Sequence, residues 1–142
     1  MPLSHLLDTS VLSQPIKDKP LANVLDRWSD LGDEAVCTSA ICLAEILQGL
    51  RDRESSKYWR RYRDLVENQY QVLPFDAAVA DTFSSIAVDL RRQGRPKPTL
   101  DLMIAATAAC HGLVLATLNA RDFTGIPGLV VENWGASAKP DG

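Results

Sequence analysis

The stretch His5-Leu6-Leu7-Asp8-Thr9-Ser10 decides the fold that we expect for this chain. A short apolar run ends abruptly in a carboxylate and two hydroxyl groups, which is typical of a buried strand followed by a turn. This pattern places Asp8 at the C-terminal end of the strand. In an open parallel α/β sheet, ligands bind at that edge. We therefore expect a functional site to be built around Asp8.

Strand-like and helix-like segments alternate along the remainder of the chain. Short apolar runs with the character of strands occur at residues 35–38, 71–75, 113–117 and 129–131. Apolar residues recur with helical spacing at residues 21–31, 41–50, 51–66, 79–90 and 100–110. Strands that alternate with helices favour one parallel sheet covered on both faces. The expected fold class is therefore α/β, a three-layer α/β/α sandwich with a five-stranded, mainly parallel sheet.

Several of the expected helices have distinctive local features. Ser39, Asp76 and Thr99 stand where helices begin and can cap them, because their side-chain oxygens accept hydrogen bonds from free backbone N–H groups. The helix over residues 41–50 is apolar on nearly every side, which indicates a buried helix. The basic segment over residues 51–63 is expected to form one helix with a solvated face.

The composition is typical of one globular domain. The chain has 142 residues, of which 46% are hydrophobic and 23% charged, so it can bury a sizeable core and global disorder is excluded. We expect a single domain over residues 1–134 and a frayed tail over residues 135–142. The net charge of −3 argues against nucleic-acid binding by overall charge but permits a local basic face.

We expect a cytoplasmic protein without a membrane segment. No apolar run approaches the roughly 18 residues of a membrane span, and the first residues carry neither a basic region nor a small-residue cleavage site. Cys37, Cys42 and Cys110 are odd in number and match no zinc spacing, so we expect buried, reduced thiols. Neither His5 nor His111 is expected to be a metal ligand or a base.

Three further acidic residues occupy positions comparable to that of Asp8. Glu45 lies inside an apolar helix, Asp101 at the start of another helix, and Asp122 just past a strand. Carboxylates gathered in one place repel each other unless a cation neutralises them. Mg²⁺ and Mn²⁺ prefer such oxygen ligands, and in phosphodiester hydrolysis they activate water and stabilise the leaving oxygen. The four acids together predict a divalent-metal site.

Each of these acids is also compatible with a purely structural role. Asp8 and Asp122 suit simple turns, and Asp101 suits a helix start, where the dipole favours a carboxylate. Glu45 is compatible with a narrow solvated seam or with an ion pair to an arginine such as Arg51 or Arg92. Only the joint placement of the four residues points to chemistry.

Four stretches of the chain resemble the motif regions of PIN domains, and more closely those of the VapC-type toxins of type II toxin–antitoxin modules. They are residues 7–12, 44–49, 101–108 and 116–123, and the resemblance runs from about Leu3 to Trp134. It implies an α/β/α sandwich with a parallel five-stranded sheet and endoribonuclease activity that depends on Mg²⁺ or Mn²⁺. It also implies a homodimer, inhibition by a cognate antitoxin, and a higher assembly with that antitoxin.

The resemblance also implies roles for individual residues. By position, Asp8, Glu45 and Asp101 match the three acids found almost throughout the family. The fourth position is either Asp122 or Asn119, and both remain open. Hydroxyl positions that bind metal-bound water or a carboxylate are matched by Thr9, Ser10 and Thr117. We expect Asp8, Glu45, Asp101 and Asp122 to be both catalytic residues and metal ligands.

A net negative protein needs local positive charge to bind RNA. The loop with Arg91, Arg92, Arg95 and Lys97 is one candidate surface, because phosphate contacts position a strand without reading its sequence. The basic segment over residues 51–63 is a second. Its aromatic residues either stack bases or cover the inner side of the helix or a protein interface; they are Tyr58, Trp59 and Tyr62.

Two other classes of function compete with the ribonuclease. A catalytically silent PIN-like binding module would keep the fold for protein contacts only. An aspartate-nucleophile phosphatase or phosphoacceptor would use Asp8, but Ser10 stands where the haloacid-dehalogenase pattern has a second Asp, and no lysine follows residues 113–117 as a receiver domain would require. An acidic site also suggests a means of inhibition, in which an antitoxin arginine pairs with the carboxylates and displaces the metal.

Overall fold

A parallel sheet forms the centre of the molecule. The computed structural model describes residues 2–135, and its five strands lie in the order β3-β2-β1-β4-β5. All neighbouring strands run parallel. The strands are β1 (His5–Leu7), β2 (Val36–Ser39), β3 (Gln71–Leu73), β4 (Val114–Thr117) and β5 (Val130–Asn133). The expected α/β class with a five-stranded, mainly parallel sheet is confirmed.

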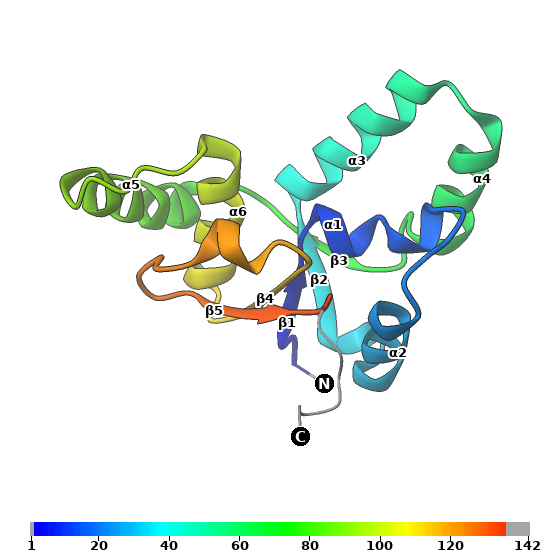
Figure 1. The fold of residues 1–142 in the computed structure, drawn as a ribbon, viewed down its shortest axis with the longest axis horizontal. Coiled ribbons are helices and arrows are strands. Elements are labelled where there is room, and N and C mark those ends of the chain that lie inside the picture. Colours follow the sequence, from blue (N-terminus) through cyan, green and yellow to red (C-terminus); the bar gives the residue numbers. More distant parts are fainter. Residues whose placement is uncertain (1, 136–142) are drawn as a thin grey trace.

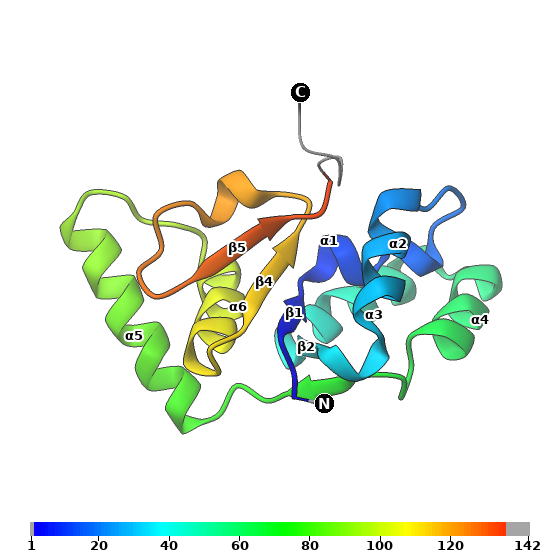
Figure 2. The same cartoon turned by 90° about the horizontal axis from the view of Figure 1, so that it is seen from below.

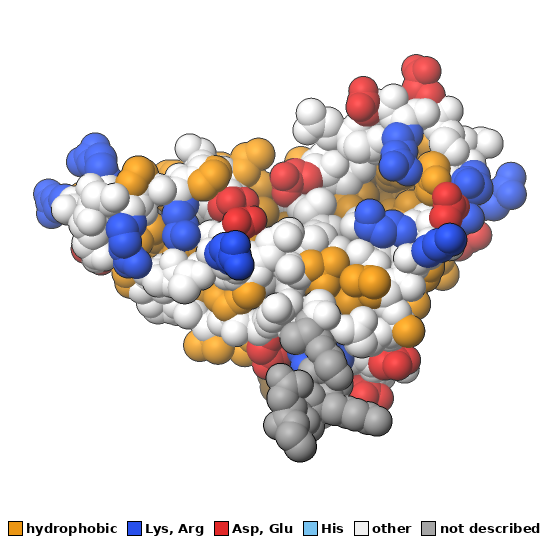
Figure 3. Space-filling model, in the orientation of Figure 1, with side chains coloured by type: hydrophobic (Ala, Val, Ile, Leu, Met, Phe, Trp, Pro, Cys, Tyr) orange, Lys and Arg blue, Asp and Glu red, His pale blue; other side chains and the backbone are white. Residues whose placement is uncertain are grey.

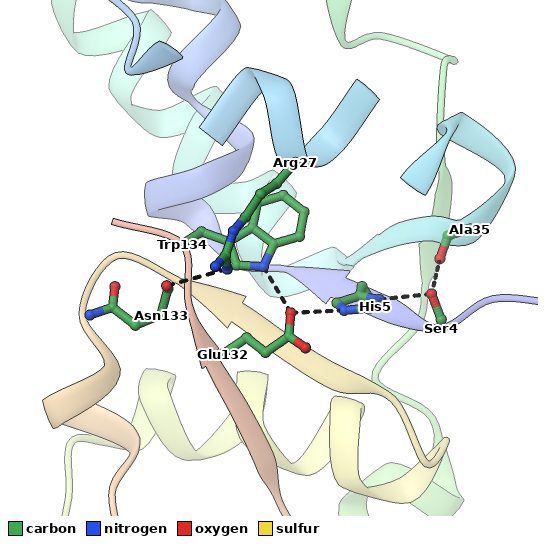
Figure 4. A network of polar contacts seen from close by, with 7 residues as sticks. All are labelled: Ser4, His5, Arg27, Ala35, Glu132, Asn133 and Trp134. Carbon is green, nitrogen blue, oxygen red and sulfur yellow. Dashed lines mark hydrogen bonds and ion pairs between the residues drawn. The ribbon is translucent and has the colours of Figure 1, made fainter. Parts of the chain in front are cut away.

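Helices cover both faces of this sheet (Figures 1 and 2). They are α1 (Thr9–Leu12), α2 (Ala22–Leu31), α3 (Ala40–Arg53), α4 (Ser56–Leu65), α5 (Ala77–Arg92) and α6 (Thr99–Cys110), with the short 3₁₀ helices η1 (Gln14–Ile16), η2 (Asp33–Ala35) and η3 (Ala120–Phe123). In the close view of β4 and β5, α2 and α6 lie on opposite sides of the strands (Figure 4). The three-layer sandwich expected from the alternating pattern is thus present.

The position of β1 explains why the first apolar run matters. It is the middle strand, paired with β2 on one side and β4 on the other, so Leu6 and Leu7 are fully buried. Leu7 lies opposite Ala116 of β4. The residues that follow these two positions, Asp8 and Thr117, therefore emerge side by side at the C-terminal edge of the sheet, where the pattern of the first strand predicts Asp8.

Two of the three helix caps that the sequence predicts are present. Ser39 Oγ accepts a hydrogen bond from the backbone N–H of Cys42 at 3.0 Å, and Asp76 Oδ1 accepts one from Val79 at 3.1 Å. Thr99 is instead the first residue of α6, and no side chain caps that helix. The turn expected after Asp8 is also wrong, because α1 begins directly at the next residue and Asp8 caps it.

The basic segment forms parts of two helices rather than one. α3 ends at Arg53, and Glu54 adopts a left-handed conformation with φ 52° before α4 begins. This break turns α4 back toward η1, where Arg61 donates a hydrogen bond to the carbonyl of Ile16 at 2.9 Å. The expectation of a single helix is wrong because a tertiary contact outweighs the continuous helical pattern.

The expectation that the apolar helix is buried on most sides is also wrong. In α3 only Cys42, Ile46 and Leu50 are buried, whereas Leu43 and Leu47 are half-buried. The helix projects from one side of the sheet (Figure 1), so Ile41, Leu43 and Leu47 pack against the core but stay partly exposed.

Three smaller expectations concern cysteines, membranes and the tail. Cys37 and Cys42 are free and buried, as expected, and Cys110 is free but only half-buried. None of the helices within residues 2–135 is long and apolar enough to cross a membrane. The expected tail lies outside the described residues apart from Gly135.

A polar network fastens β5 to β1 on the side of the sheet that carries α2 (Figure 4). Glu132 Oε1 lies 3.0 Å from Nε2 of His5 and accepts a hydrogen bond from the Trp134 indole at 3.1 Å. Burial opposes ionisation of Glu132, but the Trp134 hydrogen bond and the His5 ring outweigh it and lower the pKa of this carboxyl. His5 is thus engaged in structure, away from the carboxylates at the other edge.

Replacing Ser39 by alanine tests the start of α3. The substitution removes a buried cap, so we expect Ser39→Ala to lower the free energy of unfolding by about 1 kcal/mol. Urea unfolding followed by circular dichroism measures this loss. Ser84→Ala is the control, since Ser84 is exposed inside α5 and its loss should change stability by less than about 0.5 kcal/mol. Equal stability of the two variants would contradict the role of Ser39.

Candidate active site

Asp8 is held rigidly at the C-terminal edge of the sheet. Its side chain is 5% exposed, and hydroxyl groups donate to both of its oxygens: Ser10 Oγ to Oδ1 and Thr117 Oγ1 to Oδ2, each at 2.5 Å. Thr117 Oγ1 in turn accepts the backbone N–H of Asn119 at 2.9 Å. The hydroxyls of Ser10 and Thr117 therefore support this carboxylate, as expected.

The environment makes a negative charge on Asp8 unfavourable. Burial raises the pKa of Asp8, and the hydrogen bonds from Ser10, Thr117 and the Val11 backbone only partly offset this effect. A buried carboxylate without a cationic partner is expensive to ionise. A bound cation would remove that penalty.

Glu45 lies on α3 across from α1. Its Oε1 accepts a hydrogen bond from Thr9 Oγ1 at 2.6 Å, which fixes the third expected hydroxyl beside a carboxylate. The side chain borders a groove of about 230 Å³ between α3 and η1. Of the alternatives for Glu45, the solvated seam agrees with this groove, and no ion pair joins it to Arg51 or Arg92 in residues 2–135.

Asp101 brings the other acids into the same neighbourhood. It stands in the first turn of α6, where burial and then the negative charges of Asp122, Glu45 and Asp8 raise the pKa of its carboxyl. A helix start favours an ionised carboxylate, whereas burial and repulsion at Asp101 oppose ionisation. The charges of the three other predicted acids thus all act on Asp101.

The negative charge of this neighbourhood has no ionic partner from the described chain. The ion pairs within residues 2–135 join His5 to Glu132 and Asp18 to Lys57 and Arg61. Acidic side chains lie on both sides of a hollow between the start of α3 and the lobe formed by α5, α6 and η3 (Figure 3). The carboxylates of this recess therefore form no ion pair within residues 2–135.

The carboxylates form a loose group rather than a tight cage. In the part of the chain that the structure describes, no three acidic, histidine or cysteine side chains stand close enough to bind one ion together. Mg²⁺ keeps several waters and is usually held by one or two protein carboxylates, so a tight cage is not required. The donor set of carboxylate oxygens with supporting hydroxyls fits such an ion.

The predicted basic loop lies only partly at this site. Lys97 lowers the pKa of Asp101 by its charge, which opposes the acids, so it is a neighbour of the carboxylates. Arg95 donates a hydrogen bond to the carbonyl of Gly125 at 3.0 Å, which anchors the loop beside η3. Arg91 and Arg92 are exposed at the end of α5, and Arg92 borders a hollow along that helix.

A groove that leaves the site has no counterpart in the sequence pattern. It runs from Thr9 and Glu45 to Arg53 and Tyr58, and Lys17, which follows η1, contributes to its wall. From the sequence, the residues near η1 indicate only a polar connection. The groove is missed because it depends on the contact between η1 and α4, which are far apart in the chain. Acidic and basic residues thus lie at opposite ends of one groove.

The chain is similar to known nucleases along most of its length. Residues 5–129 match the family model described as PIN domain. The tRNA(fMet)-specific endonuclease VapC of Shigella flexneri is 36% identical over 93% of this chain and 98% of its own length. Ribonuclease VapC2 of Haemophilus influenzae is 32% identical with the same coverage.

Solved structures give the same result for the fold. The crystal structure of DNA-bound VapBC from Salmonella typhimurium contains a chain with a TM-score of 0.80 and 32% identity, covering 93% of this chain and 98% of that one. FitAcB from Neisseria gonorrhoeae gives a TM-score of 0.84 at 29% identity, over 94% and 99% of the two chains.

Mutual repulsion among the acids can be measured through stability. Asp101→Asn removes one charge and no described hydrogen bond, so we expect the free energy of unfolding at neutral pH to rise by at most about 1 kcal/mol, because the site is partly exposed and screened. A raised carboxyl pKa means that folded protein binds the proton more tightly than unfolded protein. The stability that Asp101→Asn gains over the parent protein should therefore vanish as the pH falls below the pKa of Asp101.

Thermal unfolding over a range of pH, without divalent ions, measures this effect. Asp64→Asn on α4 is the matched control, since it removes an exposed acid away from the site and should not stabilise the protein. A loss of stability in Asp101→Asn at neutral pH would show that the carboxylates do not repel one another.

Proposed function

The chain belongs to the PIN domain family and, within it, to the VapC ribonucleases, and on this basis we propose that the carboxylates around Asp8 are the reaction centre of a divalent-metal-dependent endoribonuclease. The protein is a ribonuclease toxin of the toxin–antitoxin class. One observation carries the assignment of the site. The charges of Glu45, Asp122 and Asp8 all act on Asp101 in a recess where none of the four has an ionic partner among residues 2–135.

Mg²⁺, with Mn²⁺ as a substitute, is the proposed cofactor. One or two of the carboxylates of Asp8, Glu45 and Asp101 would hold it directly and the rest through its waters. Asp122 is the proposed fourth acid, because its charge is the strongest of the three that act on Asp101. When bound, such an ion supplies activation of the attacking water and neutralisation of charge on the leaving oxygen.

The protein's own residues orient this centre. Ser10 and Thr117 fix both oxygens of Asp8, and Thr9 fixes one oxygen of Glu45, so each carboxylate presents a defined direction. Lys97, beside Asp101, supports a contact with a phosphate of the substrate. Rigid placement of this kind lowers the entropic barrier to reaction.

A transfer RNA is the substrate class that we propose. The relatives from Shigella flexneri and Salmonella typhimurium are both named tRNA(fMet)-specific endonucleases, at 36% and 35% identity. A tRNA substrate also implies action in the cytoplasm, where the RNA is found.

The alternatives agree less well with the site. A phosphatase or phosphoacceptor that uses Asp8 lacks its usual partners, because Ser10 stands where the second Asp would be and no lysine follows residues 113–117. A silent binding module gives no reason for Ser10, Thr117 and Thr9 to orient carboxylates. Cleavage assays separate these possibilities from the nuclease.

Partners are proposed for the two apolar surfaces that the fold leaves open. Several solved relatives are complexes named VapBC or FitAB, so a cognate antitoxin is the expected partner. The groove beside Glu45, with Ile46 and Leu50 in its lining, suits an antitoxin segment. We assign the half-buried apolar side chains of α3 to further contacts, in a homodimer or in a higher assembly with the antitoxin.

Conservative substitutions of the acids test the reaction centre. Asp8→Asn and Asp101→Asn should each lower cleavage of unfractionated tRNA in Mn²⁺ at least about 100-fold, because each removes charge that would neutralise the ion. Asp122→Asn should lose less, since Asp122 is exposed. Gel assays of the purified variants, with EDTA as a further control, measure the rates.

Asp64→Asn provides the control for loss of an acid elsewhere and should cleave like the parent protein. Circular dichroism must show that all variants are folded. Undiminished cleavage by a pure Asp8→Asn preparation would rule out the proposed centre.

Inhibition gives a separate prediction. We expect an antitoxin arginine to enter the groove and pair with the carboxylates, so that it takes the place of the ion. In a co-crystal structure with the antitoxin, a guanidinium should lie within ion-pair distance of Asp8, Glu45 or Asp101. A complex in which no basic side chain approaches these residues would refute this mode of inhibition.

A further inference from the structure

The basic segment over residues 51–63 contains a set of cation–ring contacts that takes no part in the carboxylate site. At the end of α3 and along α4, cationic side chains lie over aromatic rings. Arg51 and Arg63 lie 5.6 and 5.7 Å from the ring centre of Trp59, and Arg53 lies 4.7 Å from that of Tyr58. Lys and Arg side chains gather over these helices on the face shown in Figure 3.

These contacts change the role of the aromatic residues. A base needs an open ring face for stacking, but the rings of Trp59 and Tyr58 already carry cations of the same chain. Tyr62 is buried. The rings therefore hold the arginines in place through cation–π contacts.

The cations differ in whether they are already neutralised. Asp18 pairs with Lys57 at 3.1 Å and with Arg61 at 2.8 Å, so these two fasten the loop after η1 to α4. Arg51, Arg53 and Arg63 are exposed and take part in no ion pair within residues 2–135. Their guanidinium groups are free to bind an anion.

Arg53 and Tyr58 connect this surface to the groove of the reaction centre, whereas Arg51, Trp59 and Arg63 lie outside the lining of that groove. The groove that begins at Thr9 and Glu45 ends at Arg53 and Tyr58. Arg51 follows Glu45 by six positions of α3, about 9 Å along the axis at about 1.5 Å per residue. An RNA strand held here would be held at nucleotides that flank the bond to be cleaved.

We propose that Arg51 and Arg63 on Trp59, with Arg53 on Tyr58, form a second RNA-binding surface that grips the phosphate backbone beside the cleaved bond. The proposal rests on the ribonuclease function. Unpaired guanidinium groups match phosphates in charge and in bidentate geometry, and the rest of this net negative protein does not attract RNA by overall charge. The surface contributes affinity and position rather than sequence recognition.

Binding of unfractionated tRNA, measured by filter retention in the Asp8→Asn background, tests the proposal. The double substitution Arg51→Gln and Arg63→Gln should weaken binding several-fold and make it less sensitive to salt. The slope of log affinity against log salt should fall by about 0.7–0.9 for each phosphate that the variant no longer binds.

Two further variants distinguish phosphate binding from base stacking. Arg60→Gln removes the same charge from α4, but from a side chain with no ring contact in the described chain, so it should change the slope less than Arg63→Gln. Trp59→Leu, if thermal unfolding shows it folded, should weaken binding because its arginines lose their support. Weaker binding by Trp59→Leu with full binding by the double variant would mean base stacking and would overturn the proposal.

The outcome is distinguishable from a failure of the ribonuclease assignment. If the double variant binds tRNA with parental affinity and salt slope while cleavage still requires Asp8, the surface is not an RNA site and the reaction centre stands. If the double variant binds RNA like the parent protein but fails to bind the antitoxin, the surface is a protein-docking face, and this result would equally overturn the proposal. If no preparation cleaves RNA, the reaction centre itself is wrong.

Discussion

Repulsion between carboxylates is the constraint on which the site depends. Asp8 is buried at the end of the central strand, and the charges of Asp8, Glu45 and Asp122 all reach Asp101. In a folded protein such a group is unfavourable unless something compensates it. Here hydroxyl donors from Ser10 and Thr117 compensate only in part, so the recess is poised for a cation, either a metal ion or a basic side chain of a partner.

The parallel sheet is what brings these acids together. Because β1 and β4 are neighbours with their C-terminal ends at one edge, Asp8 and Thr117 meet although they lie 109 positions apart in the sequence. α3 and α6, which contact each other, then place Glu45 near Asp101. The stability of the sheet and the chemistry of its edge are therefore linked through β1, since the strand that fills the core also ends in the central carboxylate.

Helix α3 lines the groove from its acidic end to its basic end. α3 carries Glu45 near its start and Arg51 and Arg53 in its last turn, so it passes from an acidic recess to a basic, aromatic surface. A metal-loaded recess and a cationic patch both suit a polyanion, and an antitoxin segment lying in this groove would cover both. Competition between RNA and antitoxin for one surface would then explain how a single partner silences the enzyme.

Sequence patterns predict the features of the fold and site that are decided locally. The buried strand before Asp8, the caps at Ser39 and Asp76 and the sheet class all follow from apolar spacing and side-chain chemistry. The burial of α3 is predicted wrongly, because whether Leu43 and Leu47 are covered depends on neighbours that the pattern does not contain. The left-handed Glu54 and the arginines seated on Trp59 are missed for the same reason, since both arise where α4 folds back on α3 and η1.

Crystals soaked in Mn²⁺ provide the most direct test of the central claim. We predict an anomalous difference peak in direct coordination with an Asp8 oxygen and with at least one oxygen of Glu45 or Asp101, and no such peak in crystals of Asp8→Asn. Manganese bound only at other surfaces, with nothing beside Asp8 at saturating concentration, would contradict a metal centre at this edge of the sheet.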